Sequence, residues 1–367
     1  MKERVFIKGN DALALAALKS GMKFFAGYPI TPASEIPEYL AEKYQADQIR
    51  MERGEKPDCP GFVFMQAESE IASINMVLGA AATGARAMTA SSSPGISLKM
   101  EGISYLHGSE LPAVVVDVMR GGPGLGNIAS EQSDYAQLVK GGGHGNYRNI
   151  VLAPNSVQEM YDFMPLAFDL AFKYRIVVVV ATDNCLGQMK ENIVIRKIAP
   201  GNPYNMSEWA VDENSARKRR LITSLRIEPE DLEQHVLGLK AKYDVIEANE
   251  VRQETYLADD AELICVAYGI CSRIVKGAIH TLRRQGVKVG LIRPRTLWPF
   301  PYQAIYTTTD RARAYLTVEL SIGQMLEDVR LAVNGKREVE LQFRAGGMLP
   351  TEADVVDRML SMQKRYC

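Results

Sequence analysis

The chain has 367 residues, of which 47% are hydrophobic and 24% charged, a composition typical of a soluble globular protein with about two domains. Lysine and arginine number 43 against 44 aspartates and glutamates, so the net charge of −1 provides no field that would attract nucleic acid or a membrane surface. The apolar runs are well below the roughly 20 residues of a membrane-spanning helix, and the residues from Met1 to Arg4 do not begin a signal peptide, so we expect a cytoplasmic protein.

Short apolar runs alternate with helical patterns from residue 4 to about residue 195, beginning with a strand at Val5–Lys8. This alternation predicts parallel α/β structure. The runs Pro112–Met119 and Ile176–Ala181 are almost continuously apolar, which is typical of strands buried on both faces. We therefore predict a first domain over residues 1–195, with these two strands at the centre of a parallel sheet and helices on both of its faces.

Residues 196–258 are richer in charged and polar side chains, and strand-like runs disappear there. We predict a connector with a solvated helix around Leu232–Asn249, in which the basic run Arg217–Arg220 is a solvated face rather than a binding patch. The α/β pattern then resumes and predicts a second, smaller α/β domain over residues 259–367.

Polar residues follow several predicted strands, at the carboxyl edge where α/β proteins bind ligands. Glu68 and Glu70 begin a helix after one strand, and either can bind a ligand or compensate the helix dipole. Ser91–Gly95 follows the next strand and suits a carboxylate or carbonyl oxygen, although a helix cap with a proline explains the same residues. Thr31 is predicted to cap a helix whatever else it does. Arg120, beside the glycine-rich loop that follows Pro112–Met119, is well placed to bind a carboxylate with two hydrogen bonds.

The spacing of cysteines and histidines argues against a metal or redox centre on this chain. The five cysteines include no Cys-x-x-Cys pair, and the four histidines share no metal-ligand spacing. The glycine-rich loop Gly121–Gly126 lacks the Gly-x-Gly-x-x-Gly spacing of a dinucleotide site. We expect a loop that lets its main chain approach a ligand or a neighbouring chain.

Taken together, these segments resemble the alpha subunits of 2-oxoacid:ferredoxin oxidoreductases, especially those that act on branched-chain 2-oxoacids such as 2-oxoisovalerate. The segments that carry the resemblance span nearly the whole chain: Gly27–Ser34, Gln66–Glu70, Ser91–Gly95, Met119–Gly126, Thr296–Pro301 and Glu319–Met325. The resemblance implies a thiamine-diphosphate pyrimidine-binding domain followed by a domain like the carboxyl-terminal domain of transketolase.

The resemblance also implies partner chains. The Gly-Asp-Gly motif with which this family holds Mg²⁺ and the cofactor diphosphate is absent from the sequence. A beta subunit is therefore expected to supply that half of the thiamine-diphosphate site, together with a gamma subunit and a ferredoxin-like subunit that carries iron-sulfur clusters. No metal is expected on this chain.

The resemblance assigns roles to individual residues. In the pyrimidine domains that this chain resembles, the activating glutamate precedes a helix glycine by nine positions, and Gly79 stands in this relation to Glu70 but not to Glu68. Glu70 is thus expected to hydrogen-bond the aminopyrimidine ring of the cofactor and activate it. The other implied roles are cofactor contacts for Tyr28, Pro29 and Gly95, and substrate contacts for Thr31, Ser93 and Arg120.

The implied reaction is the oxidative decarboxylation of a 2-oxoacid, most like 3-methyl-2-oxobutanoate, with coenzyme A to acyl-CoA, CO₂ and reduced ferredoxin. The sequence leaves open a subunit of an enzyme for 2-oxoglutarate, pyruvate or an aryl-pyruvate. A non-enzymatic scaffold or assembly subunit with the same fold is a further alternative, against which the presence of Glu70, Thr31 and Arg120 argues.

Overall fold

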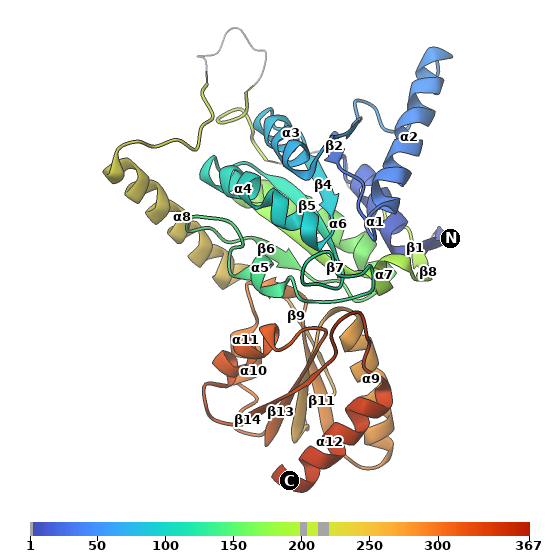
Figure 1. Cartoon of the computed structure of the whole chain (residues 1–367), viewed down its shortest axis with the longest axis vertical. Helices are drawn as coiled ribbons and strands as arrows, with labels where there is room; N and C mark the ends of the chain where they lie inside the picture. Colours follow the sequence, from blue (N-terminus) through green and yellow to red (C-terminus); the bar gives the residue numbers. More distant parts are fainter. Residues whose placement is uncertain (1–2, 199–203, 212–219) are drawn as a thin grey trace.

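The computed structural model describes residues 3–198, 204–211 and 220–367. A seven-stranded sheet in the order β12-β6-β7-β5-β4-β2-β3 forms the centre of the upper part of the molecule (Figure 1). Its neighbouring strands pair in parallel, except that β12 runs antiparallel to β6. The strands are β2 (Phe24–Gly27), β3 (Val63–Gln66), β4 (Ala87–Ser91), β5 (Ala113–Met119), β6 (Ile150–Leu152), β7 (Val177–Asp183) and β12 (Thr296–Trp298).

The two valine-rich runs form β5 and β7, which pair with each other and are buried along their whole length. Their position in the middle of the sheet confirms the prediction, because a strand covered on both faces needs apolar side chains on both.

Helices cover both faces of this sheet (Figure 1). Two of them, α3 and α4, pack on each other, and α1 packs on α6 and α2. Parallel strands joined by right-handed crossovers place helices on one face or the other according to the direction in which the chain moves along the sheet. The helices of this part are α1 (Gly9–Lys19), α2 (Glu35–Glu52), α3 (Glu70–Ala82), α4 (Ser93–Gly108), α5 (Tyr135–Val139), α6 (Val157–Tyr174) and α7 (Asn184–Gln188).

The first strand of the chain lies outside the parallel sheet. β1 (Arg4–Lys8) pairs antiparallel with β8 (Lys190–Val194) in a separate two-stranded sheet. The expectation that Val5–Lys8 opens the parallel alternation is therefore wrong. β1 is only partly buried, and Phe6 is 63% exposed, so this strand does not meet the burial that a place inside the sheet requires.

A five-stranded sheet in the order β14-β13-β10-β11-β9 forms the lower part of the molecule (Figure 1). Its strands are parallel except for β9, which runs antiparallel to β11, and α9 and α12 pack on each other. The elements are β9 (Gln253–Tyr256), β10 (Leu263–Val266), β11 (Val289–Pro294), β13 (Ala314–Glu319), β14 (Glu338–Phe343), α9 (Gly269–Arg284), α10 (Tyr302–Tyr306), α11 (Gln324–Val333) and α12 (Glu352–Tyr366).

The segment between the two parts contains the predicted helix. α8 (Pro229–Asn249) is mostly exposed and buries only Leu239, Tyr243 and Ile246, as expected for a solvated helix. Of the basic run, residues 217–219 lie outside the described residues, and the guanidinium of Arg220 donates a 2.7 Å hydrogen bond to the main-chain oxygen of Ala210.

Two strands cross the predicted domain bounds. β9 lies in the predicted connector, where no strand was expected, because it is a short, polar edge strand without an apolar run. β12 follows the second domain's β11 in the chain but pairs with β6 of the first sheet. The second part of the chain therefore contributes one strand, β12, to the first sheet. Among the described helices, none combines the length and apolarity needed to cross a membrane.

Candidate active site

Four neighbouring strands end at the same edge of the seven-stranded sheet, and the predicted site residues follow them. β2, β3, β4 and β5 are parallel, so their carboxyl ends meet there. Thr31 follows β2, Glu70 follows β3, Ser93 and Gly95 follow β4, and Arg120 follows β5. Tyr28 and Pro29 follow β2 directly and are exposed, with Tyr28 at 41%.

The structure separates the two candidate glutamates. Glu70 is the first residue of α3 and is only 6% exposed, whereas Glu68 is exposed. The Ser69 hydroxyl caps the helix by accepting a 3.1 Å hydrogen bond from the main-chain nitrogen of Ala72, so Glu70 is not needed as the cap. Within the described part of the chain, no group donates a hydrogen bond to the Glu70 carboxylate. A buried carboxylate without a donor is unfavourable unless a ligand or partner supplies one.

Gly95 makes room for this carboxylate. A Cβ atom at position 95 would lie 2.1 Å from the Ser91 hydroxyl and 2.8 Å from Oε1 of Glu70, so only glycine lets α4 begin this close to α3. The Ser91 and Ser92 hydroxyls are buried without a hydrogen-bond partner among the described residues. The predicted pair Glu70 and Gly95 is therefore brought together, in a place with unused polar atoms.

Arg120 connects the three predicted substrate residues. Its Nη1 donates a 2.7 Å hydrogen bond to the main-chain oxygen of Thr31, and its Nη2 donates one of 3.2 Å to that of Leu125. Its main-chain nitrogen donates a 3.1 Å hydrogen bond to the Ser93 hydroxyl. The Nε of this 7% exposed arginine is buried and has no partner within the described residues. The guanidinium is thus fixed in direction and keeps an unused donor.

Thr31 does not cap a helix, so that prediction is wrong. α2 begins at Glu35, after Ser34, and Thr31 is exposed and joined to Pro32 by a cis peptide bond. A residue before proline is disfavoured in the helical conformation, which moves the start of the helix beyond this point. The main-chain oxygen of Thr31 is instead used to hold Arg120.

A pair of buried acids beneath Ser93 was missed from the sequence. The Ser93 hydroxyl donates a 2.5 Å hydrogen bond to Asp134, and Asp134 neighbours the fully buried Asp117 of β5. Burial, reinforced by the adjacent carboxyl group, raises the pKa of Asp117 well above its usual range, and burial also raises the pKa of Asp134. The signal was available, because Asp117 is the one polar residue in the run Ala113–Met119.

A cavity of about 550 Å³ lies between Arg120 and the second domain, within the size range of small-molecule sites. The glycine-rich loop forms one wall, and Ser321, Ile322 and Gln324 form another. Glu131 ties the glycine-rich loop to the second domain, because its carboxylate accepts hydrogen bonds from the main-chain nitrogens of Gly122 (2.9 Å) and Gly346 (3.1 Å).

The buried Glu319 shapes the wall that comes from the second domain. Its carboxylate accepts hydrogen bonds from the Ser321 hydroxyl (2.5 Å) and from the main-chain nitrogens of Met325 and Leu326 (both 3.0 Å), at the amino end of α11. Burial raises its pKa, and these hydrogen bonds oppose the rise. This glutamate thus has the structural role of a helix cap.

Lys99 is a second buried residue that the sequence analysis missed. It is fully buried, and its ammonium group donates to the main-chain oxygen of Glu70 (3.3 Å) and to the Ser73 hydroxyl. Burial lowers its pKa to about 8, against an opposing effect of the Glu70 charge. Helical spacing could have revealed it, since Lys99 lies three residues after Ile96 and four before Ile103, on the apolar face of α4.

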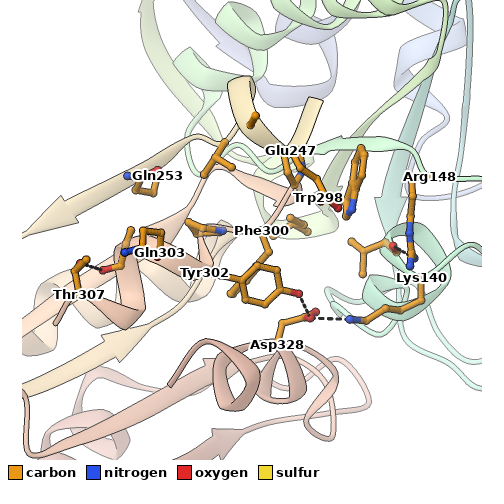
Figure 2. A pocket seen from close by; sticks show the side chains of 17 residues that line it. Lys140, Arg148, Glu247, Gln253, Trp298, Phe300, Tyr302, Gln303, Thr307 and Asp328 are labelled. Carbon is orange, nitrogen blue, oxygen red and sulfur yellow. Dashed lines mark hydrogen bonds and ion pairs between the residues drawn. The ribbon is translucent and has the colours of Figure 1, made fainter. Parts of the chain in front are cut away.

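A larger cavity of about 630 Å³ lies away from these residues, where α8 and the Thr296–Pro301 segment meet the loop after α5 (Figure 2). None of the predicted site residues lines it. Asp328 lies at its base and accepts hydrogen bonds from the hydroxyls of Tyr302 (2.6 Å) and Tyr135 (2.7 Å) and from the ammonium group of Lys140 (2.6 Å). This carboxylate is saturated by the protein itself.

The family comparison identifies the part of the chain that carries this sheet edge as a thiamine-diphosphate-binding domain. Residues 15–257 match the family described as pyruvate flavodoxin/ferredoxin oxidoreductase, thiamine diphosphate-binding. Residues 261–355 match pyruvate:ferredoxin oxidoreductase core domain II. The chain belongs to the 2-oxoacid:ferredoxin oxidoreductases, as a subunit of such an enzyme, and the resemblance predicted from the sequence is confirmed.

Individual relatives support the same family. The chain is 52% identical over 353 residues to ketoisovalerate oxidoreductase subunit VorB of Methanothermobacter thermautotrophicus, covering 96% of both chains. Among solved structures it is similar to 2-oxoglutarate:ferredoxin oxidoreductase from Magnetococcus marinus, with 26% identity and a TM-score of 0.84 over 98% of this chain and 65% of that one. A split-gene transketolase, 13% identical with a TM-score of 0.60 over 98% of this chain and 99% of that one, shares the fold.

The residues at the sheet edge fit the pyrimidine half of thiamine diphosphate. Among the described residues, Glu70 has no hydrogen-bond donor and the Ser91 and Ser92 hydroxyls have no partner, while Gly95 leaves room beside the carboxylate. A ring nitrogen that shares a proton with the carboxylate would satisfy Glu70. The described residues contain no cluster of three or more histidines, cysteines or acids suited to a metal ion.

Proposed function

We propose that this chain is the alpha subunit of an oxidoreductase that converts 3-methyl-2-oxobutanoate and coenzyme A to the acyl-CoA, CO₂ and reduced ferredoxin. The observation that carries the proposal is the buried Glu70 beside Gly95, whose carboxylate has no donor among the described residues, at the edge that also presents Arg120. The choice of a branched-chain substrate is supported by the 52% identity to a subunit named for ketoisovalerate.

Glu70 is proposed to hold a proton at a ring nitrogen of the cofactor pyrimidine. Glu70 is only 6% exposed, and a hydrogen bond is stronger in such surroundings than in water. When bound, thiamine diphosphate supplies the electron sink that decarboxylation of a 2-oxoacid needs. Tyr28, Pro29 and Gly95 are proposed to contact the cofactor around this point.

Arg120 is proposed to bind the substrate carboxylate, with Thr31 and Ser93 beside it. Its two terminal nitrogens are anchored on main-chain oxygens, and the unused Nε adds a donor, so the guanidinium is held in place before substrate arrives. The Ser93 hydroxyl proton is directed to Asp134, so Ser93 is proposed to orient Arg120 and to line the cavity.

A beta subunit is proposed to cover the exposed face around Glu70 and to supply the Mg²⁺ and diphosphate half of the site. Large apolar side chains that are 41–84% exposed surround this edge: Tyr28, Met65, Ile71, Leu98 and Leu125. Such a group of exposed apolar residues is typical of a protein interface. Gamma and ferredoxin-like iron-sulfur subunits are proposed to complete the enzyme, in the cytoplasm.

The charge of the cavity favours a monocarboxylic substrate. Among the described residues that line it, Arg120 is the one lysine or arginine, and the acids Glu131 and Asp134 lie nearby. A dicarboxylate such as 2-oxoglutarate would need a second cation for its distal carboxylate. This observation ranks 2-oxoglutarate as the second candidate substrate.

Co-expression of the chain with its partner subunits, followed by assays of branched-chain, aryl and dicarboxylic 2-oxoacids, tests the proposal. We expect the highest kcat/KM with 3-methyl-2-oxobutanoate and dependence on coenzyme A and ferredoxin. A higher kcat/KM with 2-oxoglutarate or pyruvate would reassign the substrate. Inactivity of a complex fully loaded with cofactor towards every 2-oxoacid would favour the scaffold alternative.

A further inference from the structure

Lys99 differs in its partners from two other buried cations of the chain, Arg293 and Arg86. Arg293 is 2% exposed and pairs with two carboxylates, and the buried Arg86 pairs with Asp169. Lys99 is completely buried, and no carboxylate in the described residues lies within 4.0 Å of its ammonium group. Its hydrogen-bond partners are a main-chain oxygen and a serine hydroxyl.

The location makes the positive charge still less favourable. Both acceptors belong to the first turn of α3, where the helix dipole is positive and repels a cation. A buried ammonium is expensive unless a negative charge compensates it. Among the described residues, Glu70 is the one charged group that acts on Lys99, and its charge favours the protonated amine.

Lys99 is therefore tied to Glu70 in two ways. It donates a hydrogen bond to the main-chain oxygen of Glu70, and it donates another to Ser73, whose hydroxyl itself donates to the same oxygen at 2.8 Å. These contacts hold the turn from which the carboxylate projects. The carboxylate lies on the Gly95 side, where the cofactor pyrimidine fits.

We propose that Lys99 is a positioning residue of the cofactor site, which holds the first turn of α3 and counterbalances the charge of the Glu70 carboxylate. This inference rests on the proposed role of Glu70. It assigns to Lys99 no contact with cofactor or substrate. Its consequence is that cofactor activation depends on the protonation of a lysine that the reaction itself does not use.

The sign of the pH dependence follows from this arrangement. Burial gives Lys99 a pKa of about 8, with Glu70 as the charged group facing it, so the ammonium is present at neutral pH and is lost as the pH rises through 8. Above that pH the positive charge beside Glu70 disappears, and activation is expected to decline.

Titration of Lys99 in the full-length chain without cofactor tests the electrostatic coupling. The lysine side chains are labelled with ¹³C at Cε, and the Lys99 signal is identified by its absence from K99R. We expect a midpoint near pH 8 in the unmodified chain. In E70Q the midpoint should fall to a lower pH, because the Glu70 charge raises the pKa of Lys99. A midpoint that E70Q leaves unchanged overturns the proposal.

Variants in the reconstituted complex test the functional role. K99M should lower activity at pH 7 about tenfold or more, the effect of one pKa unit, and should remove the decline near pH 8. K99R should restore activity and extend it above pH 8, because a guanidinium stays charged there. S73A keeps the charge and removes one acceptor, so its activity should fall only about threefold, a change of under 1 kcal/mol.

The outcomes separate this proposal from the assignment of Glu70. Loss of activity in E70Q together with unchanged activity and an unchanged pH profile in K99M would refute the role of Lys99 alone. Full activity in E70Q would refute the role of Glu70. If K99M does not fold, the titration of E70Q and the pH profile of K99R still decide the matter, because neither relies on that variant.

Discussion

Two buried carboxylates of the molecule, Asp328 and Glu70, have opposite surroundings. Asp328, at the base of the larger cavity, is 1% exposed and accepts hydrogen bonds from Tyr302 and Lys140 (Figure 2). It accepts a third from the hydroxyl of Tyr135. Glu70, at the edge of the seven-stranded sheet, is 6% exposed and has no donor among the described residues. The saturated carboxylate locks two domains together, whereas the unsaturated one is available to a ligand.

The strongest test of this contrast is removal of the charge at Glu70. E70Q in the reconstituted complex should lose about 10²–10⁴-fold in kcat, the usual contribution of a group that holds a proton in catalysis, while the complex still assembles. Turnover and subunit composition are measured on the same preparation. E68Q is the matched control and should retain nearly full activity, because Glu68 is exposed. Equal losses in the two variants would contradict the assignment.

Arg120 gives the next largest effect. R120M removes the proposed ligand of the substrate carboxylate. The loss of transition-state stabilisation should be about 2–5 kcal/mol, which lowers kcat/KM roughly 30-fold or more. R120K keeps a charge but loses the fork that reaches both Thr31 and Leu125, so it should recover only part of that loss. Steady-state kinetics over a range of 2-oxoacid concentrations measures both. Normal saturation behaviour in R120M would disprove a carboxylate role.

The saturated carboxylate should affect stability instead of cofactor activation. D328A removes an acceptor shared by three donors and leaves the buried Tyr135 hydroxyl unpaired, so we expect a loss of about 3–4 kcal/mol in the free energy of unfolding. Y302F removes one of these hydrogen bonds from a 41% exposed tyrosine and should lose about 1 kcal/mol or less. Urea unfolding followed by circular dichroism measures the difference. A D328A chain as stable as Y302F would show that Asp328 is not a structural lock.

Apolar patterns in the sequence predicted much of the fold. The strands that they did not predict share one property. The two valine-rich runs predicted β5 and β7 because burial on both faces allows few polar residues. β9 and β12 escaped prediction because edge strands of three or four residues carry no such pattern, and the pairing of β12 with β6 depends on contacts between distant segments.

The sequence predicted those candidate site residues that directly follow the parallel strands. Parallel strands bring their carboxyl ends together, so Thr31, Glu70, Ser93 and Arg120 could be placed at one edge from the sequence. The choice between Glu68 and Glu70 needed the family spacing, and burial now separates them. Lys99 remained hidden because its importance comes from a contact across two helices, which no local pattern encodes.

Asp183 is a buried carboxylate with fewer hydrogen bonds than Asp328 and more than Glu70. Its substitution has the smallest expected effect of the carboxylate changes. Its Oδ1 accepts a 3.1 Å hydrogen bond from the main-chain nitrogen of Leu186, but burial raises its pKa from 3.8 to about 6. A raised pKa means that its contribution to stability is complete below pH 4 and is lost as the pH rises through 6. D183N keeps a hydrogen-bond acceptor but cannot ionise. Between pH 4 and pH 7 its free energy of unfolding should therefore rise by up to about 3 kcal/mol relative to that of the unmodified chain. Urea unfolding at several pH values measures this gain, and D310N, which alters an exposed aspartate, should show none. If the free energies of unfolding of D183N and D310N changed with pH in the same way, the pKa of Asp183 would not be raised.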